Sequence, residues 1–128
     1  MRVVLVDDSL VIRKRLLDLC NQLHEVDLVG TAASVTEAVA AIRLYRPDVL
    51  ILDIHLISGT GFDVLTALGG ELPAMTVIMI TSSAIEPYRS VAARHGVGYL
   101  FDKVNEFQCI RDTLETLIAA GKSPQPKA

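Results

Sequence analysis

Five short apolar runs recur along the chain, separated by segments in which apolar residues have helical spacing. The runs cover residues 2–6, 26–33, 48–53, 75–81 and 97–101. The first, third and fourth runs are almost continuously apolar and rich in Val and Ile, which is typical of strands buried on both faces of a parallel sheet. We therefore predict five β-strands.

The segments that follow these runs predict five helices, over residues 12–23, 34–45, 62–68, 87–95 and 107–118. Ser34 with Glu37 three residues later matches a capping box, and Asn105 is the predicted cap of the last helix. Strands that alternate with helices indicate an α/β fold: a doubly wound, five-stranded parallel sheet of flavodoxin-like type with helices on both faces. We expect one domain over residues 1–120, with 121–128 as a flexible tail or truncated linker.

Polar residues follow the apolar runs where each predicted strand ends. They are Asp7 and Asp8 after the first run, Asp53 at the end of the third, Thr81 at the end of the fourth, and Lys103 after the fifth. Ligands of such sheets bind outside the carboxyl ends of the strands, so these side chains should meet at one edge. Crowded carboxylates favour a bound cation, and oxygen ligands suit Mg²⁺.

A carboxylate, a hydroxyl and an ammonium group around a metal suit phosphoryl transfer to a carboxylate. Asp53 is the best candidate nucleophile because it ends the central apolar run, and its product would be an acyl phosphate. Metal and Lys103 would neutralise charge on the phosphoryl oxygens, while the Thr81 hydroxyl would donate a hydrogen bond.

Composition narrows the class of protein further. Apolar residues make up 51% and charged residues 21% of 128 residues, which is typical of a globular protein. The formal net charge of −3 gives no reason to expect direct nucleic-acid binding. Cys20 and Cys109 lack metal-type spacing, and no apolar run has signal-peptide or membrane-spanning character. We therefore expect a soluble, cytoplasmic protein that does not bind membranes.

The motifs "VLVDDS", "VLILDIHLISGTGFDVL", "VIMITSS" and "GYLFDK" together resemble the receiver domain of two-component response regulators, in its stand-alone, chemotaxis-regulator-like form. The resemblance covers the chain from Arg2 to about Ala120. It implies that Asp53 is the phosphoacceptor and that Asp8, helped by Asp7, holds Mg²⁺. The remaining roles that it implies are a metal-binding backbone carbonyl at His55, a phosphoryl-sensing hydroxyl at Thr81 and an ion partner at Lys103.

The same resemblance implies a phosphorelay switch rather than an enzyme, since such domains perform only their own phosphoryl transfer and dephosphorylation. The phosphoryl group would come from a sensor histidine kinase or a phosphotransfer protein. Phosphorylation would then alter a face that binds an unidentified output protein, and the resemblance leaves room for a weak dimer. That face would comprise the helix at 87–95, the strand at 97–101 and the last helix, with Tyr88, Tyr99 and Phe101 as its aromatic residues.

Two positions depart from the family pattern. Val104 stands where the family commonly has a proline after the lysine, and Leu100 stands where it has a switch aromatic. Tyr99 and Phe101 flank Leu100, so Tyr99 would replace the switch aromatic only if the local register shifts. We therefore predict a muted ring switch, with the loop after Thr81 transmitting more of the signal.

Two other classes of function compete with this interpretation. A phosphotransferase of the haloacid-dehalogenase type also uses a strand-end Asp nucleophile, but it needs a second Asp two residues later, where this chain has His55. A nucleotide- or flavin-binding domain would need a Gly-rich loop after the first strand, where this chain has "DDSL".

Overall fold

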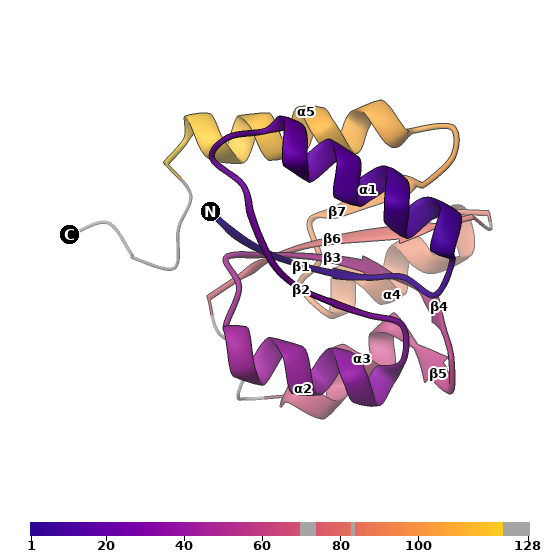
Figure 1. The fold of residues 1–128 in the computed structure, drawn as a ribbon. Coiled ribbons are helices and arrows are strands. Elements are labelled where there is room, and N and C mark those ends of the chain that lie inside the picture. Colours follow the sequence, from indigo (N-terminus) through magenta and orange to yellow (C-terminus); the bar gives the residue numbers. More distant parts are fainter. Residues whose placement is uncertain (70–73, 83, 122–128) are drawn as a thin grey trace.

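The computed structural model describes residues 1–69, 74–82 and 84–121. At its centre is a parallel sheet of five strands in the order β2-β1-β3-β6-β7 (Figure 1). The strands are β1 (Arg2–Val6), β2 (Asp27–Ala32), β3 (Val49–Asp53), β6 (Thr76–Thr81) and β7 (Tyr99–Asp102). The predicted sheet is thus confirmed, and β3 is buried along its whole length, as its unbroken apolar sequence requires.

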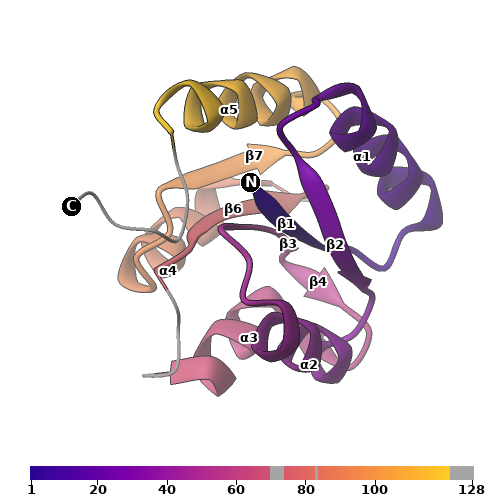
Figure 2. The same cartoon turned by 60° about the vertical axis from the view of Figure 1, so that its left-hand side comes forward.

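Helices cover both faces of the sheet, as predicted. They are α1 (Leu10–Gln22), α2 (Val35–Tyr45), α3 (Gly61–Leu68), α4 (Arg89–Arg94), which follows a short 3-10 helix η2 (Glu86–Tyr88), and α5 (Phe107–Ala119). Figures 1 and 2 show α1 and α5 side by side on one face and α2 and α3 on the other. The chain therefore forms a three-layer α/β domain whose strand ends remain accessible at one edge.

Alternating strand residues feed two separate apolar layers. Leu5, Ile51 and Ile80 pack with α1 and α5, whereas Leu52 and Met79 pack with α2, α3 and α4. Successive side chains of a strand point to opposite faces, so each strand contributes to both layers. This arrangement explains why every residue of β3 before Asp53 is apolar.

Local details differ from the sequence-based predictions at several points. The α5 helix begins after Glu106 without a side-chain cap, so the prediction of Asn105 as its cap is wrong. Ser34 does cap α2, with its hydroxyl accepting from the Glu37 N–H. The antiparallel hairpin of β4 (His55–Leu56) and β5 (Gly59–Thr60) was not predicted. Most of the predicted tail, residues 122–128, lies outside the described residues.

Candidate functional site

Lys103 bridges two buried carboxylates at the carboxyl edge of the sheet. Its Nζ atom donates to Asp7 Oδ2 over 2.9 Å and to Asp53 Oδ2 over 2.8 Å. The exposed fractions are 0% for Asp7, 2% for Asp53 and 5% for Lys103. Two anions and one cation are thus held together out of contact with bulk water, which requires a specific geometry to be tolerated.

Backbone groups fix the other oxygen atoms of these two carboxylates. Asp7 Oδ1 accepts from the Ser9 N–H over 2.7 Å, and Asp53 Oδ1 accepts from the His55 N–H over 3.3 Å. The Arg13 guanidinium also reaches this loop and donates to the backbone carbonyl of Asp7. Sequence reasoning missed the contributions of Ser9 and Arg13, because backbone donors and carbonyl acceptors leave no residue-type signal.

The third acid, Asp8, completes a carboxylate cluster. One carboxylate oxygen from each of Asp7, Asp8 and Asp53 lies within 4.8 Å of the others. Asp8 is exposed, so the cluster opens to solvent on its side. Three hard oxygen donors with one accessible side suit a small divalent cation such as Mg²⁺, which keeps part of its water shell. Lys103 alone leaves the cluster with a net negative charge, which a cation would offset.

The titration behaviour of the cluster reflects this crowding. Burial raises the pKa of the Asp53 carboxyl above its ordinary value of 3.8; the hydrogen bond from Lys103 opposes this effect, and the charge of Asp7 adds to it. Burial alone would lower the pKa of Lys103, but its hydrogen bonds to Asp53 and Asp7 raise it overall. The lysine therefore stays charged at neutral pH, whereas burial disfavours the charged form of the Asp53 carboxyl.

Thr81 and His55 complete the set of predicted residues. Thr81 is fully buried at the end of β6, the strand next to β3, and its backbone carbonyl accepts from the Lys103 N–H over 2.9 Å. His55 places its backbone beside Asp53 while its side chain is exposed. Its ring lies 3.1 Å (Nε2 to Oη) from Tyr88, a contact that the sequence did not indicate.

The turn that presents Lys103 is held by the residue before it. Asp102 Oδ1 accepts from the N–H groups of Val104 and Asn105, each over 2.9 Å. These bonds lower the pKa of the Asp102 carboxyl. A proline at position 104 has no N–H and could not donate. With Val104 in place of the family's proline, the turn is closed by hydrogen bonds to the Asp102 side chain.

This set of groups at the strand ends agrees with comparisons to known proteins. A family model described as the response regulator receiver domain matches residues 3–115. The chain belongs to the response regulator receiver domain family. Receiver domains are regulatory modules of two-component systems, so the haloacid-dehalogenase and nucleotide-binding alternatives are not favoured.

One curated protein and two solved structures illustrate what this receiver domain is similar to. It is 33% identical over 123 residues to the DNA-binding transcriptional activator DevR/DosR of Mycobacterium tuberculosis, covering 95% of this chain and 56% of that protein. The response regulator domain of Thermotoga maritima CheB has a TM-score of 0.77 at 26% identity, covering 98% of both chains. CheY6 of R. sphaeroides, solved with the P1 domain of CheA3, has a TM-score of 0.74 at 23% identity, covering 92% of this chain and 96% of that one. The chain spans about half the length of its curated relative DevR/DosR.

The register of β7 shows on which face of the sheet Leu100 and Tyr99 lie. Met79 pairs with Leu100 and Ile80 with Phe101, and no register shift occurs in this pairing. Leu100 packs in the layer of α2, α3 and α4, whereas Tyr99 packs in the layer of α1 and α5. By strand alternation Thr81 shares a face with Leu100. Tyr99 therefore lies on the opposite face of the sheet from Thr81.

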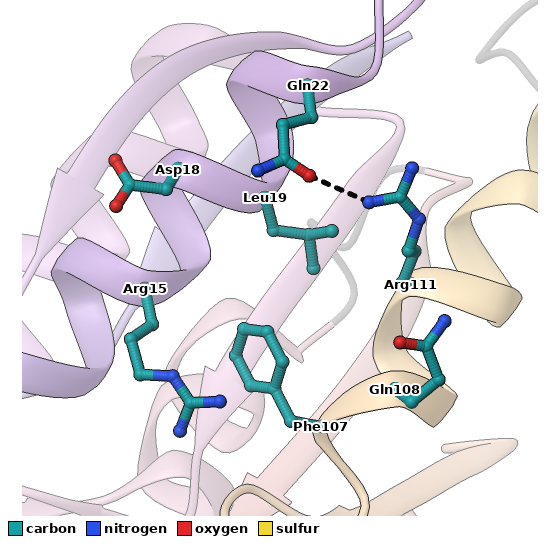
Figure 3. A pocket seen from close by; sticks show the side chains of 7 residues that line it. All are labelled: Arg15, Asp18, Leu19, Gln22, Phe107, Gln108 and Arg111. Atoms are coloured by element: carbon teal, nitrogen blue, oxygen red, sulfur yellow. Dashed lines mark hydrogen bonds between the residues drawn. The ribbon is translucent and has the colours of Figure 1, made fainter.

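A cavity of about 320 Å³ lies in the groove between α1 and α5, with Leu19 among its lining residues (Figure 3). The Arg15 guanidinium lies 4.1 Å from the centroid of the Phe107 ring, and Arg111 donates to Gln22 over 2.8 Å. These contacts join the two helices across the groove. None of the lining residues belongs to the carboxylate cluster, so the groove is distinct from the strand-end site.

The described part of the chain contains no helix with the length and apolar character needed to span a lipid bilayer.

Within the same part, Cys20 and Cys109 are both free thiols, and burial raises the pKa of Cys20 to about 11. A thiol with so high a pKa is almost entirely protonated at neutral pH and behaves as a small apolar side chain.

Proposed function

We propose that this receiver domain accepts a phosphoryl group on Asp53 in a reaction that depends on Mg²⁺. One observation supports this most directly: Lys103 contacts Asp53 at 2.8 Å inside a three-carboxylate cluster. A structural ion pair alone would need one carboxylate for one lysine. Here the excess of negative charge suits a site that binds a cation together with an incoming phosphoryl group.

In the proposed step an oxygen of the Asp53 carboxylate attacks the phosphorus of a phosphohistidine. The new O–P bond forms as the N–P bond breaks, and the electron pair of the broken bond stays on the imidazole nitrogen of the donor. Lys103 is placed to neutralise phosphoryl oxygens because its Nζ already lies against Asp53. The Thr81 hydroxyl, on the neighbouring strand, would donate to a phosphoryl oxygen.

The proposed metal ligands are carboxylate oxygens of Asp7, Asp8 and Asp53 and the backbone carbonyl of His55. Bound Mg²⁺ would offset the negative charge that builds up as phosphate oxygens approach carboxylates. Asp7 and Asp53 are oriented for this role by their hydrogen bonds to Lys103, Ser9 and His55. Asp8 is the exposed member, so its substitution should affect metal binding more than folding.

The rim of the site suggests how a protein phosphodonor would dock. Four exposed apolar side chains follow strand ends near the cluster: Leu10 (73% exposed), Val11 (70%), Ile57 (54%) and Val104 (56%). Exposed apolar side chains that gather on a surface, bordered by polar residues, mark candidate protein–protein interaction sites. We propose that a sensor histidine kinase or phosphotransfer protein packs on this donor rim, consistent with the P1 complex of the similar CheY6 protein. The free thiols Cys20 and Cys109 fit the reducing cytoplasm, where such donors act.

The output of the proposed switch is a change in the face made by α4, β7 and α5. The chain would act on itself alone, through phosphoryl transfer to Asp53 and later hydrolysis, and an output protein would read the altered face. Such a change requires only that the phosphorylated and free forms differ by a few kcal/mol in their preference for two conformations.

Incubation with acetyl phosphate and Mg²⁺, followed by intact-mass spectrometry and peptide mapping, tests the proposal. We expect one base-labile phosphoryl group on Asp53 in the wild type and none in Asp53→Asn. The matched control is Asp18→Asn, which changes an exposed acid on α1 and should leave phosphorylation unchanged. Uptake by Asp53→Asn at the wild-type level, or wild-type uptake that persists in EDTA, contradicts the proposal.

A further inference from the structure

His55 contacts the candidate phosphoacceptor and the segment before α4 at the same time. Its N–H donates to Asp53 Oδ1 over 3.3 Å, and its ring Nε2 lies 3.1 Å from the hydroxyl oxygen of Tyr88. Tyr88 is the last residue of η2 and is followed directly by α4. One residue thus connects Asp53 to the start of α4 through two hydrogen bonds.

Aromatic contacts extend this connection across the same side of the sheet. The Tyr88 ring meets the His55 ring edge-on at 5.7 Å and the Phe62 ring at 6.3 Å between centroids. Phe62 in turn stacks on His95, after the end of α4, at 5.4 Å. Four rings therefore link the β4–β5 hairpin, the start of α3 and both ends of α4.

The residue at the switch position cannot provide such a link. Leu100 shares the face of Thr81 but has neither a ring nor a hydroxyl, and Tyr99 points to the opposite layer. Tyr88 and Leu100, by contrast, both pack against the layer that contains Met79 and Ala92. Tyr88 is thus the tyrosine next to α4 that lies on the Thr81 side of the sheet.

We propose that the hydrogen bond between His55 and Tyr88 couples the chemical state of Asp53 to the position of α4, in the role that a switch aromatic at position 100 would otherwise have. The inference rests on the proposed function, because it requires an acyl phosphate on Asp53. It assigns the relay to two residues that lie outside the strand β7.

The physical basis is the changed acceptor at Asp53. Both Asp53 oxygens are engaged as those of a free carboxylate, one by Lys103 and one by the His55 N–H. In an acyl phosphate one oxygen bonds to phosphorus and the other loses its charge, which weakens a charge-assisted hydrogen bond. The His55 peptide then moves. Because His55 is paired with Thr60 in the hairpin, its ring moves together with its backbone. The contact with Tyr88 therefore belongs to the free-carboxylate form and stabilises it.

Because the contact between His55 and Tyr88 stabilises the free-carboxylate form, the proposal predicts the direction of the effect of Tyr88→Phe, which keeps the ring and removes the hydroxyl. Loss of one hydrogen bond that favours the free form should tighten binding of beryllofluoride with Mg²⁺ roughly two- to tenfold, since coupling between two sites is reciprocal. In amide NMR spectra without beryllofluoride, residues 89–94 of the variant should already shift toward their positions in the wild-type complex. Tyr99→Phe, which removes a hydroxyl on the other face, is the matched control and should match the wild type in both measurements.

A second variant separates coupling from a general loosening of the fold. On a His55→Leu background the hydroxyl of Tyr88 has lost its partner, so adding Tyr88→Phe should change neither the beryllofluoride affinity nor the shifts of residues 89–94. The proposal is overturned if Tyr88→Phe behaves like the wild type, if Tyr99→Phe has an equal effect, or if the effect persists on the His55→Leu background. A wild type that binds no beryllofluoride and takes up no phosphoryl group would instead contradict the proposed function itself.

Discussion

Lys103 Nζ lies 2.8 Å from Asp53 Oδ2, although the two residues are 50 positions apart and their strands are not neighbours. The strand β6 separates β3 from β7, so the lysine side chain crosses the end of β6 to reach the carboxylate. The turn that presents Lys103 is closed by the Asp102 side chain, which accepts a hydrogen bond from the N–H of Val104. This contact makes the charge balance of the site depend on a residue from the edge of the sheet.

Lys103→Met should destabilise the metal-free protein by about 3–5 kcal/mol, because it leaves buried Asp7 and Asp53 without their cation. Urea unfolding in EDTA measures the effect, and added Mg²⁺ should recover part of it. The control is Lys14→Met, whose ion pair with Asp18 is long (3.8 Å) and exposed, and which should change stability by less than about 1 kcal/mol. Equal losses in the two variants would contradict a buried, charge-balanced cluster.

Asp53→Asn should stabilise the metal-free protein, and the gain should grow with pH. A carboxyl whose folded-state pKa is raised binds more protons when folded, so its contribution to stability falls as pH rises from 3.8 through the folded-state pKa. Asparagine does not titrate and avoids this loss. Unfolding curves of both proteins at acidic and at neutral pH test the sign, and a gain that shrinks with rising pH would contradict it.

Asp8→Ala should weaken Mg²⁺ binding and phosphorylation together while leaving the free energy of unfolding in EDTA nearly unchanged. Asp8 is exposed, and surface substitutions of this kind usually change stability by no more than about 0.5 kcal/mol. Mg²⁺ titration followed by amide NMR gives the affinity, and acetyl phosphate labelling gives the uptake. Normal phosphate uptake by the variant would show that the metal assignment is wrong.

Gly61→Ala should destabilise the domain by about 1–3 kcal/mol and disturb the backbone of Asp53. A Cβ atom at position 61 would lie 2.5 Å from the Asp53 carbonyl oxygen and 2.8 Å from Met79 Cε. Thermal unfolding measures the loss. Gly98→Ala is the control, since a Cβ there meets no heavy atom within 4 Å and its stability should be unchanged or slightly higher. Similar melting temperatures for the two variants would contradict the predicted clash.

The donor rim predicts a difference between small and protein phosphodonors. The double variant Val11→Ser, Ile57→Ser should accept phosphate from acetyl phosphate at the wild-type rate but slow transfer from a phosphorylated histidine-kinase domain that phosphorylates the wild type. Leu44→Ser is the control, because Leu44 is equally exposed (71%) but lies on α2, outside the rim. Gel autoradiography measures the rates of phosphoryl transfer from both donors. An equal loss of rate with both donors would show that the variant impairs phosphoryl transfer itself rather than docking of the protein donor.

The order and type of the main elements could be read from the sequence because they depend on local patterns. Unbroken apolar runs such as Val49–Leu52 predict strands that are buried on both faces, and parallel strands bring their carboxyl ends to one edge in any strand order. These local features are sufficient to predict that Asp7, Asp53 and Lys103 lie close together. The resemblance to receiver domains then added roles for these residues. The family match confirms the domain family, whereas the roles of the single residues stay predictions.

Only the tertiary structure decided how these residues meet. The bridge from Lys103 to both Asp7 and Asp53 depends on the strand order β1-β3-β6-β7, which no local pattern encodes. The closure of the lysine turn by Asp102 and the contact of His55 with Tyr88 likewise depend on where separate loops come to lie. Periodicity reports which face of an element is buried, whereas loop placement follows from the packing of the whole domain.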